Sequence, residues 1–236
     1  MSLNLESTDP EKAALETPEA PLTIALPKGR LFEQVQEYFA EKGFHFKFEK
    51  RRLVAHDESG LLKIFLVKNA DLPTYVNHGI AGLGISGEDV LYETGLRFFQ
   101  LMQFDFGSTE MCLAAQKGYG KPNTIRTVSV ATKFPRFARD YFYSQGVPIQ
   151  IIKLNGSVEL APILGLAPYI VDLVETGNTL RANNLEVVDT LKKINVHLIA
   201  NPSYYKLNYR RINRFVAALH SETGDTVPDS SESGRK

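Results

Sequence analysis

The sequence predicts an α/β fold, because short apolar segments that suit buried strands alternate with segments whose apolar residues recur every three or four positions. The 236 residues, 43% of them hydrophobic and 23% charged, suffice to build a buried core. Strands separated by helices favour mixed, mostly parallel sheets, and two lobes of about 90 residues suit the chain better than one domain. We expect one lobe from residues 22–107 plus 196–220 and the other from residues 108–195.

The elements of the first lobe follow from local patterns in chain order. The segment LTIAL at 22–26 is apolar throughout and predicts a buried strand, and Pro27-Lys28-Gly29 is typical of the turn after it. A helix over 30–42 follows from its apolar spacing, and Gly43 is a typical C-terminal stop. The remaining predictions are a half-buried strand at 44–48, a fully buried strand at 63–67, a helix at 71–76 capped by Asp71, a strand at 81–86 and a helix at 87–95.

The second lobe repeats the alternation after an expected seam at 104–109, without a sequence repeat of fixed period. Its predicted strands lie at 110–115, 125–131, 147–153 and 168–174, and its predicted helices at 134–145, 157–164 and 177–183. The chain then returns with a strand at 196–200 and a last helix whose apolar stripe comprises Ile212, Phe215, Val216 and Leu219.

The two ends, 1–21 and 221–236, are predicted to be disordered tails, because they are rich in Pro, Ser, Thr and acids and offer little apolar surface. They hold most of the excess acid, so the body of this neutral chain is mildly basic. Such a charge suits anionic small molecules but is too weak and dispersed to indicate nucleic acid. Since the chain has no membrane-length apolar run, no secretory signal and a single cysteine, we expect a cytoplasmic protein that does not bind a membrane.

Several familiar motifs fail on their context. The segment GLGISG at 82–87 matches the letters of a dinucleotide fingerprint, but its first glycines lie inside a predicted strand rather than after one. The sequence contains no Walker loop, no nucleophile elbow and no metal-ligand spacing among its five histidines. Cys112 lies in an apolar strand and is predicted to be inert core.

The most informative stretch is YIVDLVETGNTL at 169–180, where an acid interrupts a buried strand and hydroxyls and a glycine open the next helix. The start of a helix exposes backbone N–H groups that bind phosphate, and Gly177 lets an anion approach the backbone. Asp172 and Glu175 would repel a bare phosphate, so they suit a ligand that also carries sugar hydroxyls or a divalent metal. The alternative is that Thr176 caps the helix and Asp172 is a satisfied acid at a strand end.

The longer segment ELAPILGLAPYIVDLVETGNTL at 159–180 resembles the signature of the ATP phosphoribosyltransferase family. The segments ALPKGRLFE, DLPTYVNHG and GLGISGEDVLYETG also resemble the family, so the resemblance extends over residues 22–220. It implies two lobes like those of a periplasmic binding protein, with the active site in the cleft between them. Because the chain ends soon after its last helix, it resembles the short form of the family. That form implies a homodimer within a hetero-oligomer that includes a regulatory subunit similar to histidyl-tRNA synthetase.

The reaction implied by the resemblance opens histidine biosynthesis: it joins N1 of ATP to C1 of phosphoribosyl pyrophosphate and releases pyrophosphate. Both substrates are polyanions, so cations must bring them together and stabilise the leaving group, and Mg²⁺ would share that task. By resemblance Arg30 and Arg51 are the catalytic cations, although Arg51 and Arg52 alone also suit a solvated surface. Arg30 opens a predicted helix, where a positive charge meets the helix dipole unfavourably, and a function would explain that arrangement.

The resemblance also implies binding residues for each ligand. The phosphoribosyl pyrophosphate site would comprise Asp172, Glu175, Thr176, Gly177, Asn178, Thr179 and Leu180. The ATP site would comprise Lys68, Asp89, Val90 and Ser108 or Thr109, with Lys28 as a neighbouring cation, and the metal, held mostly through the substrate, would meet Glu159 and Asp172. Asp89 alone also suits the first turn of a helix. Two positions depart from the family, because Lys68 stands where arginine is usual and Gly82 where aspartate is common.

A second class of function fits the same features. A non-catalytic binding module on the same two-lobed scaffold would sense a small anion without transferring anything. A requirement for magnesium distinguishes the two, because a generic anion sensor does not need the metal.

Overall fold

The computed structural model describes residues 20–122 and 126–221, so the predicted tails lie almost entirely outside the described residues. Within the described residues one sheet has the strand order β2-β3-β1-β4-β9-β5-β8-β6-β7. The strands are β1 (Leu22–Pro27), β2 (Val54–His56), β3 (Leu62–Val67), β4 (Leu83–Gly87), β5 (Phe99–Gln116), β6 (Val128–Thr132), β7 (Ile149–Lys153), β8 (Tyr169–Val174) and β9 (Leu185–Ala200). The mixed α/β class predicted from the sequence is confirmed.

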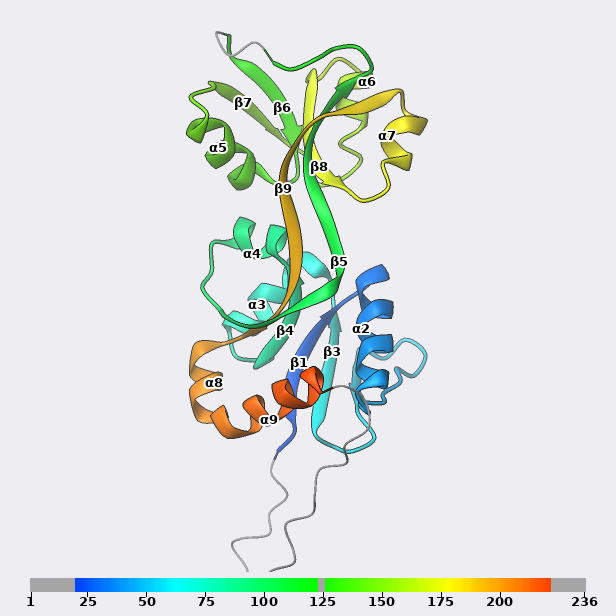
Figure 1. The fold of residues 1–236 in the computed structure, drawn as a ribbon, viewed down its shortest axis with the longest axis vertical. Helices are drawn as coiled ribbons and strands as arrows, with labels where there is room; N and C mark the ends of the chain where they lie inside the picture. The colour runs from blue at the N-terminus through cyan, green and yellow to red at the C-terminus, as the bar shows by residue number, and fades with distance from the viewer. Residues whose placement is uncertain (1–19, 123–125, 222–236) are drawn as a thin grey trace, which may run out of the picture.

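The helices lie in two groups at opposite ends of the molecule, and the long strands β5 and β9 join the two groups (Figure 1). The helices are α2 (Arg30–Glu41), α3 (Leu72–Asn77), α4 (Glu88–Thr94), α5 (Pro135–Ser144), α6 (Leu160–Ile163), α7 (Asn178–Ala182), α8 (Pro202–Leu207) and α9 (Tyr209–His220), with a 3-10 turn at Asn69–Asp71. No helix in the described part of the chain is long and apolar enough to cross a membrane.

Each end of the sheet contains a small parallel unit. Strand β1 pairs in parallel with β3 and β4, and β6 pairs in parallel with β7 and β8. Between them β5 and β9 pair antiparallel with each other, and also with β8 and β4 respectively. Four of the eight pairings in the described residues are therefore parallel, fewer than expected, because β5 and β9 extend well beyond the strands predicted at 110–115 and 196–200.

In the described residues four apolar clusters, two at each end, support the two ends, which we call lobe I (the end with β1) and lobe II (the end with β6). In lobe I the helices α2 and α9 cover the sheet, and Phe39 meets Phe215 with ring centroids 5.8 Å apart. In lobe II, α5 contributes Phe137 and Phe142 to a core with strands of its own end. The β5–β9 pairing is interrupted between Phe104 and Thr109, at the predicted seam.

Some local predictions are wrong, and packing explains them. Residues 44–48 form no strand, because Phe44 and Phe46 turn into the core beneath α2, and only a bridge from Phe46 to Asp57 remains. The strand expected at 63–67 is β3, but its outer half is only partly buried, because short β2 is its sole cover toward the sheet edge. Asp71 precedes α3 as expected, yet its side chain makes no capping hydrogen bond.

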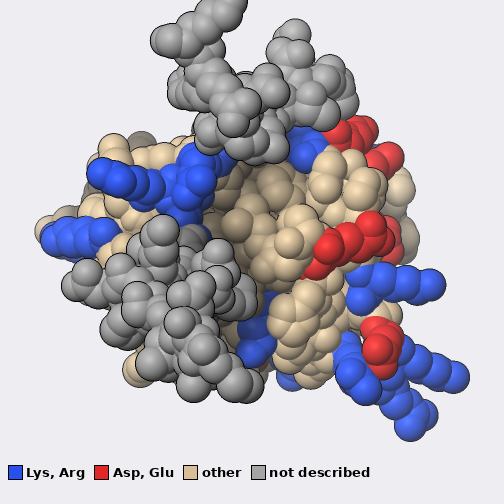
Figure 2. All heavy atoms as spheres, turned by 90° about the horizontal axis from the view of Figure 1, so that it is seen from below, with Lys and Arg blue, Asp and Glu red and all other residues tan. Residues whose placement is uncertain are grey.

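The basic residues visible on the end face of lobe I do not form one patch (Figure 2). Seen from the end of lobe I, lysine and arginine side chains stand at separate places around the rim, with uncharged surface and some acids between them (Figure 2). This view adds no support for a nucleic-acid surface.

Candidate active site

The cleft lies where the carboxyl ends of the two parallel units meet, the usual place for ligands in open α/β sheets. A cavity of about 470 Å³ is bordered by Asn69 and Asp89, which follow β3 and β4, and by Lys133 and Lys153, which lie at the ends of β6 and β7. A second cavity of about 180 Å³ joins Arg30, Asp89 and Thr109 to Glu175. Both cavities therefore have walls from lobe I and lobe II.

The predicted phosphate loop is exposed at the edge of lobe II. Gly177 has φ +69°, a left-handed conformation that favours glycine, and it precedes α7. Residues 172–180 line a cavity of about 210 Å³ together with Glu159. No side chain caps α7, so the alternative that Thr176 is merely a helix cap is wrong. Since α7 has only five residues, the loop's backbone N–H groups rather than a long helix dipole would bind an anion.

An arginine that the sequence analysis missed braces this loop. The Arg181 Nη2 atom donates hydrogen bonds to the Thr176 backbone oxygen at 2.8 Å and to Asn178 Oδ1 at 2.5 Å. A Cβ at Gly177 would lie 3.1 Å from Arg181 Nη1, so a larger residue at position 177 would crowd the guanidinium. These hydrogen bonds of Arg181 join the two ends of the turn, and the side chains of Thr176 and Thr179 beside them are exposed.

Asp172 faces the same cavity from β8 and is incompletely satisfied. Its Oδ1 atom is buried and accepts no hydrogen bond, although Lys133 Nζ lies 3.4 Å away as an ion pair. Burial raises the pKa of the Asp172 carboxyl, while Lys133 and the backbone N–H of Leu173 act in the opposite direction. Asp172 therefore has an ionic partner in Lys133, as a strand-end acid would, while its Oδ1 keeps capacity to accept a ligand hydroxyl or to bind a metal.

The structure separates the two predicted catalytic arginines. Arg30, at the start of α2 in lobe I, forms an ion pair with Glu175 on the phosphate loop of lobe II. Arg51 lies in the turn before β2, the outermost strand of the sheet, with φ +65° and an exposed side chain. It lines none of the three cavities above, and its neighbour Arg52 pairs with Glu49 at 2.9 Å.

The predicted ATP residues fall into three adjacent hollows. Asp89 and Val90 line the large cavity between the lobes, and Thr109 lines the cavity that also holds Arg30. Lys28 and Lys68 border another hollow, of about 330 Å³, beside β1 and β3. Lys68 directly precedes Asn69, which borders both interlobe cavities, so these hollows are neighbours along the edge of lobe I.

Asp89 is buried at the start of α4, with 5% of its surface exposed. Burial raises the pKa of its carboxyl, and the backbone N–H of Val90 and the charge of Lys133 act in the opposite direction. Gly87 leaves the room for it, because a Cβ at that position would lie 2.3 Å from Asp89 Oδ1. The last glycine of GLGISG therefore serves a buried acid in the cleft and not a dinucleotide.

The family departure at Gly82 has a packing partner. A Cβ there would lie 2.0 Å from Cε1 of Tyr204, whose hydroxyl accepts a hydrogen bond from the Thr23 backbone N–H at 3.0 Å. An aspartate at residue 82 would displace this ring. Gly82 thus leaves room for an aromatic contact between α8 and the sheet.

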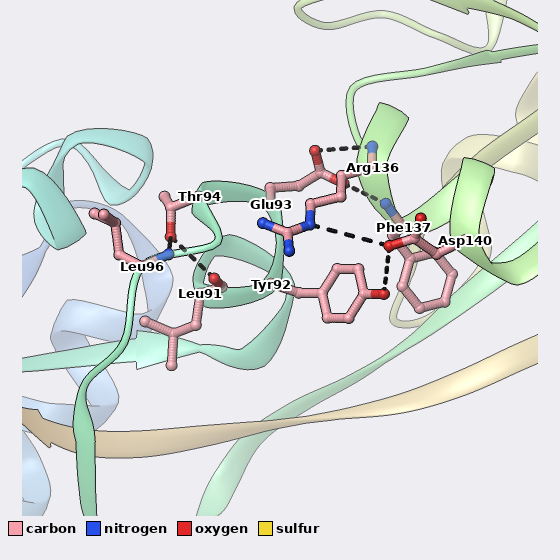
Figure 3. Close-up of polar contacts among 8 residues, drawn as sticks. All are labelled: Leu91, Tyr92, Glu93, Thr94, Leu96, Arg136, Phe137 and Asp140. Atoms are coloured by element: carbon pink, nitrogen blue, oxygen red, sulfur yellow. Dashed lines mark hydrogen bonds and ion pairs between the residues drawn. The ribbon is translucent and has the colours of Figure 1, made fainter.

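The lobes also touch between α4 and α5, beside the cleft (Figure 3). The Glu93 carboxylate accepts hydrogen bonds from the backbone N–H groups of Phe137 at 2.7 Å and Arg136 at 3.2 Å, and thereby caps α5, which has no cap of its own. The Tyr92 hydroxyl donates to Asp140 Oδ2 at 2.7 Å, and the Arg136 guanidinium lies over the Tyr92 ring. No motif in the sequence indicates this contact.

The residues present fit a metal only in company with a substrate. Among the described residues no group of three or more His, Cys, Asp or Glu side chains is placed to hold a metal ion. Glu159 and Asp172 line the same cavity, and the free Oδ1 of Asp172 is a suitable oxygen ligand. Two carboxylates match Mg²⁺, which keeps most of its coordination for water and substrate phosphates.

Comparison with known proteins agrees with these features. The family model described as "HisG: ATP phosphoribosyltransferase" matches residues 68–221. A relative from Caldicellulosiruptor saccharolyticus, "ATP phosphoribosyltransferase", is 45% identical over 207 residues, which cover 84% of this chain and 97% of the relative. Another of the same description, from Thermoanaerobacter sp. (strain X514), is 42% identical over 84% of this chain and 94% of its own length.

Solved structures give the same result. The "ATP phosphoribosyl transferase (HisG:HisZ) complex from Thermotoga maritima" contains a chain that superposes with a TM-score of 0.73 at 39% identity, covering 84% of this chain and 96% of that one. A second structure, of Tv2483 bound to L-arginine, has a TM-score of 0.56 at 12% identity and shares the fold alone.

Fold and site together define a two-lobed α/β protein whose cleft suits phosphorylated ligands that carry a sugar. With relatives above 40% identity over most of its length, the chain belongs to the ATP phosphoribosyltransferase family.

Proposed function

We propose that this protein transfers the phosphoribosyl group of phosphoribosyl pyrophosphate to N1 of ATP, giving 1-(5-phosphoribosyl)-ATP and pyrophosphate, the first step of histidine biosynthesis. Family membership supports the reaction. The observation that carries its assignment to this cleft is the free, buried Oδ1 of Asp172 beside an exposed glycine-containing loop. A phosphorylated pentose supplies hydroxyls for that oxygen and a phosphate for the loop.

In this proposal the loop from Glu175 to Leu180 binds the 5-phosphate, and Asp172 accepts from the ribose hydroxyls. The backbone approach at Gly177 and the exposed Thr176 and Thr179 hydroxyls support the phosphate position. Arg30 would exchange Glu175 for the departing pyrophosphate, because the leaving oxygen gains negative charge as the C1–O bond breaks. Arg51 stays a proposal without support from the geometry of a single chain.

ATP would occupy the lobe I side of the cleft. Asp89 and Val90 border the large cavity, and Thr109, Lys28 and Lys68 border its neighbours. Lobe I in this proposal comprises residues 22–107 plus 196–220, and lobe II comprises residues 108–195. Binding in one cleft between the lobes would bring the two polyanions to reacting distance.

Magnesium enters the proposal through the substrates. Glu159 and Asp172 would be its protein ligands, and most of its coordination would come from phosphate and water oxygens. When bound, the ion would neutralise phosphate charge that would otherwise keep the substrates apart.

We also propose a regulatory partner and a compartment. The similar chain from Thermotoga maritima was solved as a HisG:HisZ complex. On this basis the present chain would form a homodimer within a hetero-oligomer that includes a subunit similar to histidyl-tRNA synthetase, in the cytoplasm.

The test is to mix the protein and its synthetase-like subunit with ATP, phosphoribosyl pyrophosphate and Mg²⁺, and to measure phosphoribosyl-ATP by its absorbance or by mass spectrometry. Product that depends on all three supports the proposal. Absence of product, together with phosphoribosyl pyrophosphate binding that ignores the metal, would instead indicate the anion-binding module.

A further inference from the structure

The cleft contains a lysine that the reading of the sequence did not single out. Lys133 follows β6 directly, and Lys153 ends β7, its parallel neighbour, with Thr132 and Lys153 in register. The carboxyl ends of parallel strands meet at one edge of a sheet, so both ammonium groups belong to the wall of lobe II that faces lobe I. They border the cavity of about 470 Å³ that Asn69 and Asp89 border from the other side.

The backbone at Lys133 is fixed by its neighbour. The Thr132 side chain is fully buried, donates a hydrogen bond to the Val171 backbone oxygen at 2.6 Å and accepts one from the Phe134 N–H at 2.9 Å. These bonds tie the end of β6 to β8 and to the turn before α5. The Lys133 backbone is therefore held at the cleft by this turn, while its side chain is 41% exposed.

The ammonium of Lys133 lies at the junction of two cavities. It borders the large interlobe cavity, and it lies 3.4 Å from Asp172 Oδ1, which borders the loop cavity of lobe II. The contact with Asp172 lacks hydrogen-bond geometry, so Asp172 Oδ1 stays without a hydrogen bond. The ammonium also lies over the Phe134 ring, 5.0 Å from its centroid, and neither contact occupies all three of its donors, so it is able to bind a further anion.

We propose that Lys133, with Lys153 beside it, forms a polyphosphate-binding subsite in the interlobe cavity, and that Lys133 contacts phosphate oxygens of a bound substrate. This inference rests on the proposed function for its ligands, which are the triphosphate of ATP or the pyrophosphate of the phosphoribosyl donor. Both present the same chemistry, a chain of linked phosphates with several negative charges. Binding of the sugar to Asp172 would release Lys133 toward these oxygens.

The proposed role of Lys133 is electrostatic, and the step transfers no proton to or from this residue. During transfer the N1 lone pair forms the N1–C1 bond, and the electron pair of the C1–O bond leaves with pyrophosphate. Lys133 keeps its proton and lowers the energy of nearby phosphate charge. Its position next to both Asp172 and Asp89 would place this charge where the two substrates meet.

A binding experiment tests the subsite without any turnover. The full chain with its regulatory subunit is titrated calorimetrically with sodium tripolyphosphate and with pyrophosphate, without Mg²⁺, as wild type and as Lys133→Met, Lys133→Arg and Lys117→Met. Lys117 is an exposed lysine beyond the far end of β5 and removes the same charge away from the cleft. We expect Lys133→Met to weaken binding about tenfold or more, as for loss of a charged hydrogen bond, and the other two variants to bind like wild type.

Kinetics then identify the source of the phosphates. A higher KM for ATP alone in Lys133→Met assigns the triphosphate, and a higher KM for phosphoribosyl pyrophosphate alone assigns the pyrophosphate. Unchanged tripolyphosphate and pyrophosphate binding in Lys133→Met, or equal loss in Lys117→Met, overturns the subsite. If the wild type binds polyphosphate through Lys133 but makes no phosphoribosyl-ATP, the subsite stands and the proposed function fails.

Discussion

Two of the contacts between the lobes in the described residues differ in kind. Between α4 and α5 a largely exposed contact combines a helix cap, a tyrosine–aspartate hydrogen bond and an arginine over an aromatic ring. At the phosphate loop the contact is a single ion pair between Arg30 and Glu175, whose side chains are 61% and 39% exposed. The first type of contact is expected to be strong and insensitive to salt, and the second weak and screened.

This difference indicates a division of labour. A contact that satisfies the N-terminus of α5 holds the lobes in register whether or not a substrate is present. The exposed ion pair at the phosphate loop is easily replaced by a phosphate that binds the same arginine. We infer that the α4–α5 contact fixes the relative position of the lobes. We also infer that the Arg30–Glu175 ion pair is formed when the site is empty and broken when the site is filled. Each prediction below tests one side of this comparison.

The largest effect is expected from Glu93→Ala. The substitution removes the acceptor for the Arg136 and Phe137 N–H groups, and loss of a helix cap costs about 1–2 kcal/mol of stability. Denaturant unfolding measures the loss, and hydrogen exchange of the Phe137 amide should accelerate. Glu37→Ala, at an exposed position of α2, is the control and should change stability by less than about 0.5 kcal/mol. Equal stability of both variants would show that the cap does not form in solution.

A smaller effect is expected from Gly95→Ala, which probes the same contact from another side. Gly95 ends α4 with φ +67°, and a Cβ there would lie 1.7 Å from Arg136 Nη1, so the guanidinium must leave the Tyr92 ring. Gly79→Ala is a matched control, because Gly79 has φ +70° with nothing within 4 Å of its Cβ. Both variants should lose about 1 kcal/mol through backbone strain. Any additional loss of stability in Gly95→Ala measures the contribution of the Arg136 contact. If Gly95→Ala loses no more stability than Gly79→Ala, the arginine contact does not stabilise the protein.

Tyr92→Phe should cost about 0.5–1.5 kcal/mol below pH 10, since it removes one hydrogen bond and keeps the ring. The hydrogen bond to Asp140 and, less, burial raise the pKa of Tyr92 above its ordinary 10.0. A raised pKa in the folded state means that the stabilisation is complete below pH 10 and is lost as the pH rises through the folded value. Unfolding curves of wild type and variant should therefore converge above pH 10. A constant difference across this range would contradict the bond.

The α4–α5 contact also shows where sequence reasoning ends. Helix α4 and its glycine stop were predicted from GEDVLYETG, and α5 from its apolar spacing, and both are confirmed. The bond between them joins residues more than forty positions apart, and no periodicity encodes such a pairing. The same holds for β5 and β9, whose polar middle segments lack strand alternation and are ordered by pairing with each other.

The candidate site likewise contains residues that the sequence predicted and residues that only the fold shows. A local motif predicted the loop at 175–180 and Asp172, which the structure brings into one cavity. Lys133 and Arg181 carry no motif, and only the tertiary arrangement places one beside Asp172 and the other across the loop. Arg51 was grouped with Arg30 by resemblance to the family, and in the fold it lies in the turn before the edge strand β2. A resemblance along the sequence does not show how far apart two such side chains lie in the fold.

The smallest effect on stability is expected from Arg30→Ala, and it separates the two contacts most sharply. Loss of one exposed ion pair should change the free energy of unfolding by about 0–1 kcal/mol, and the change should vanish in 0.5 M salt, whereas the Glu93→Ala loss should persist. Turnover should nevertheless fall more than substrate binding, because Arg30 is proposed to stabilise charge that develops as pyrophosphate leaves.

Glu175→Gln is the matched variant for that prediction, because it breaks the same ion pair and leaves the arginine in place. If the pair only joins the lobes, both variants should behave alike. If Arg30 serves the leaving group, kcat should fall much further in Arg30→Ala than in Glu175→Gln, whose effect should lie mainly in the KM for phosphoribosyl pyrophosphate. A defect in Arg30→Ala confined to KM would contradict the leaving-group role, and the ion pair would then be a lobe contact of the same kind as the one between α4 and α5.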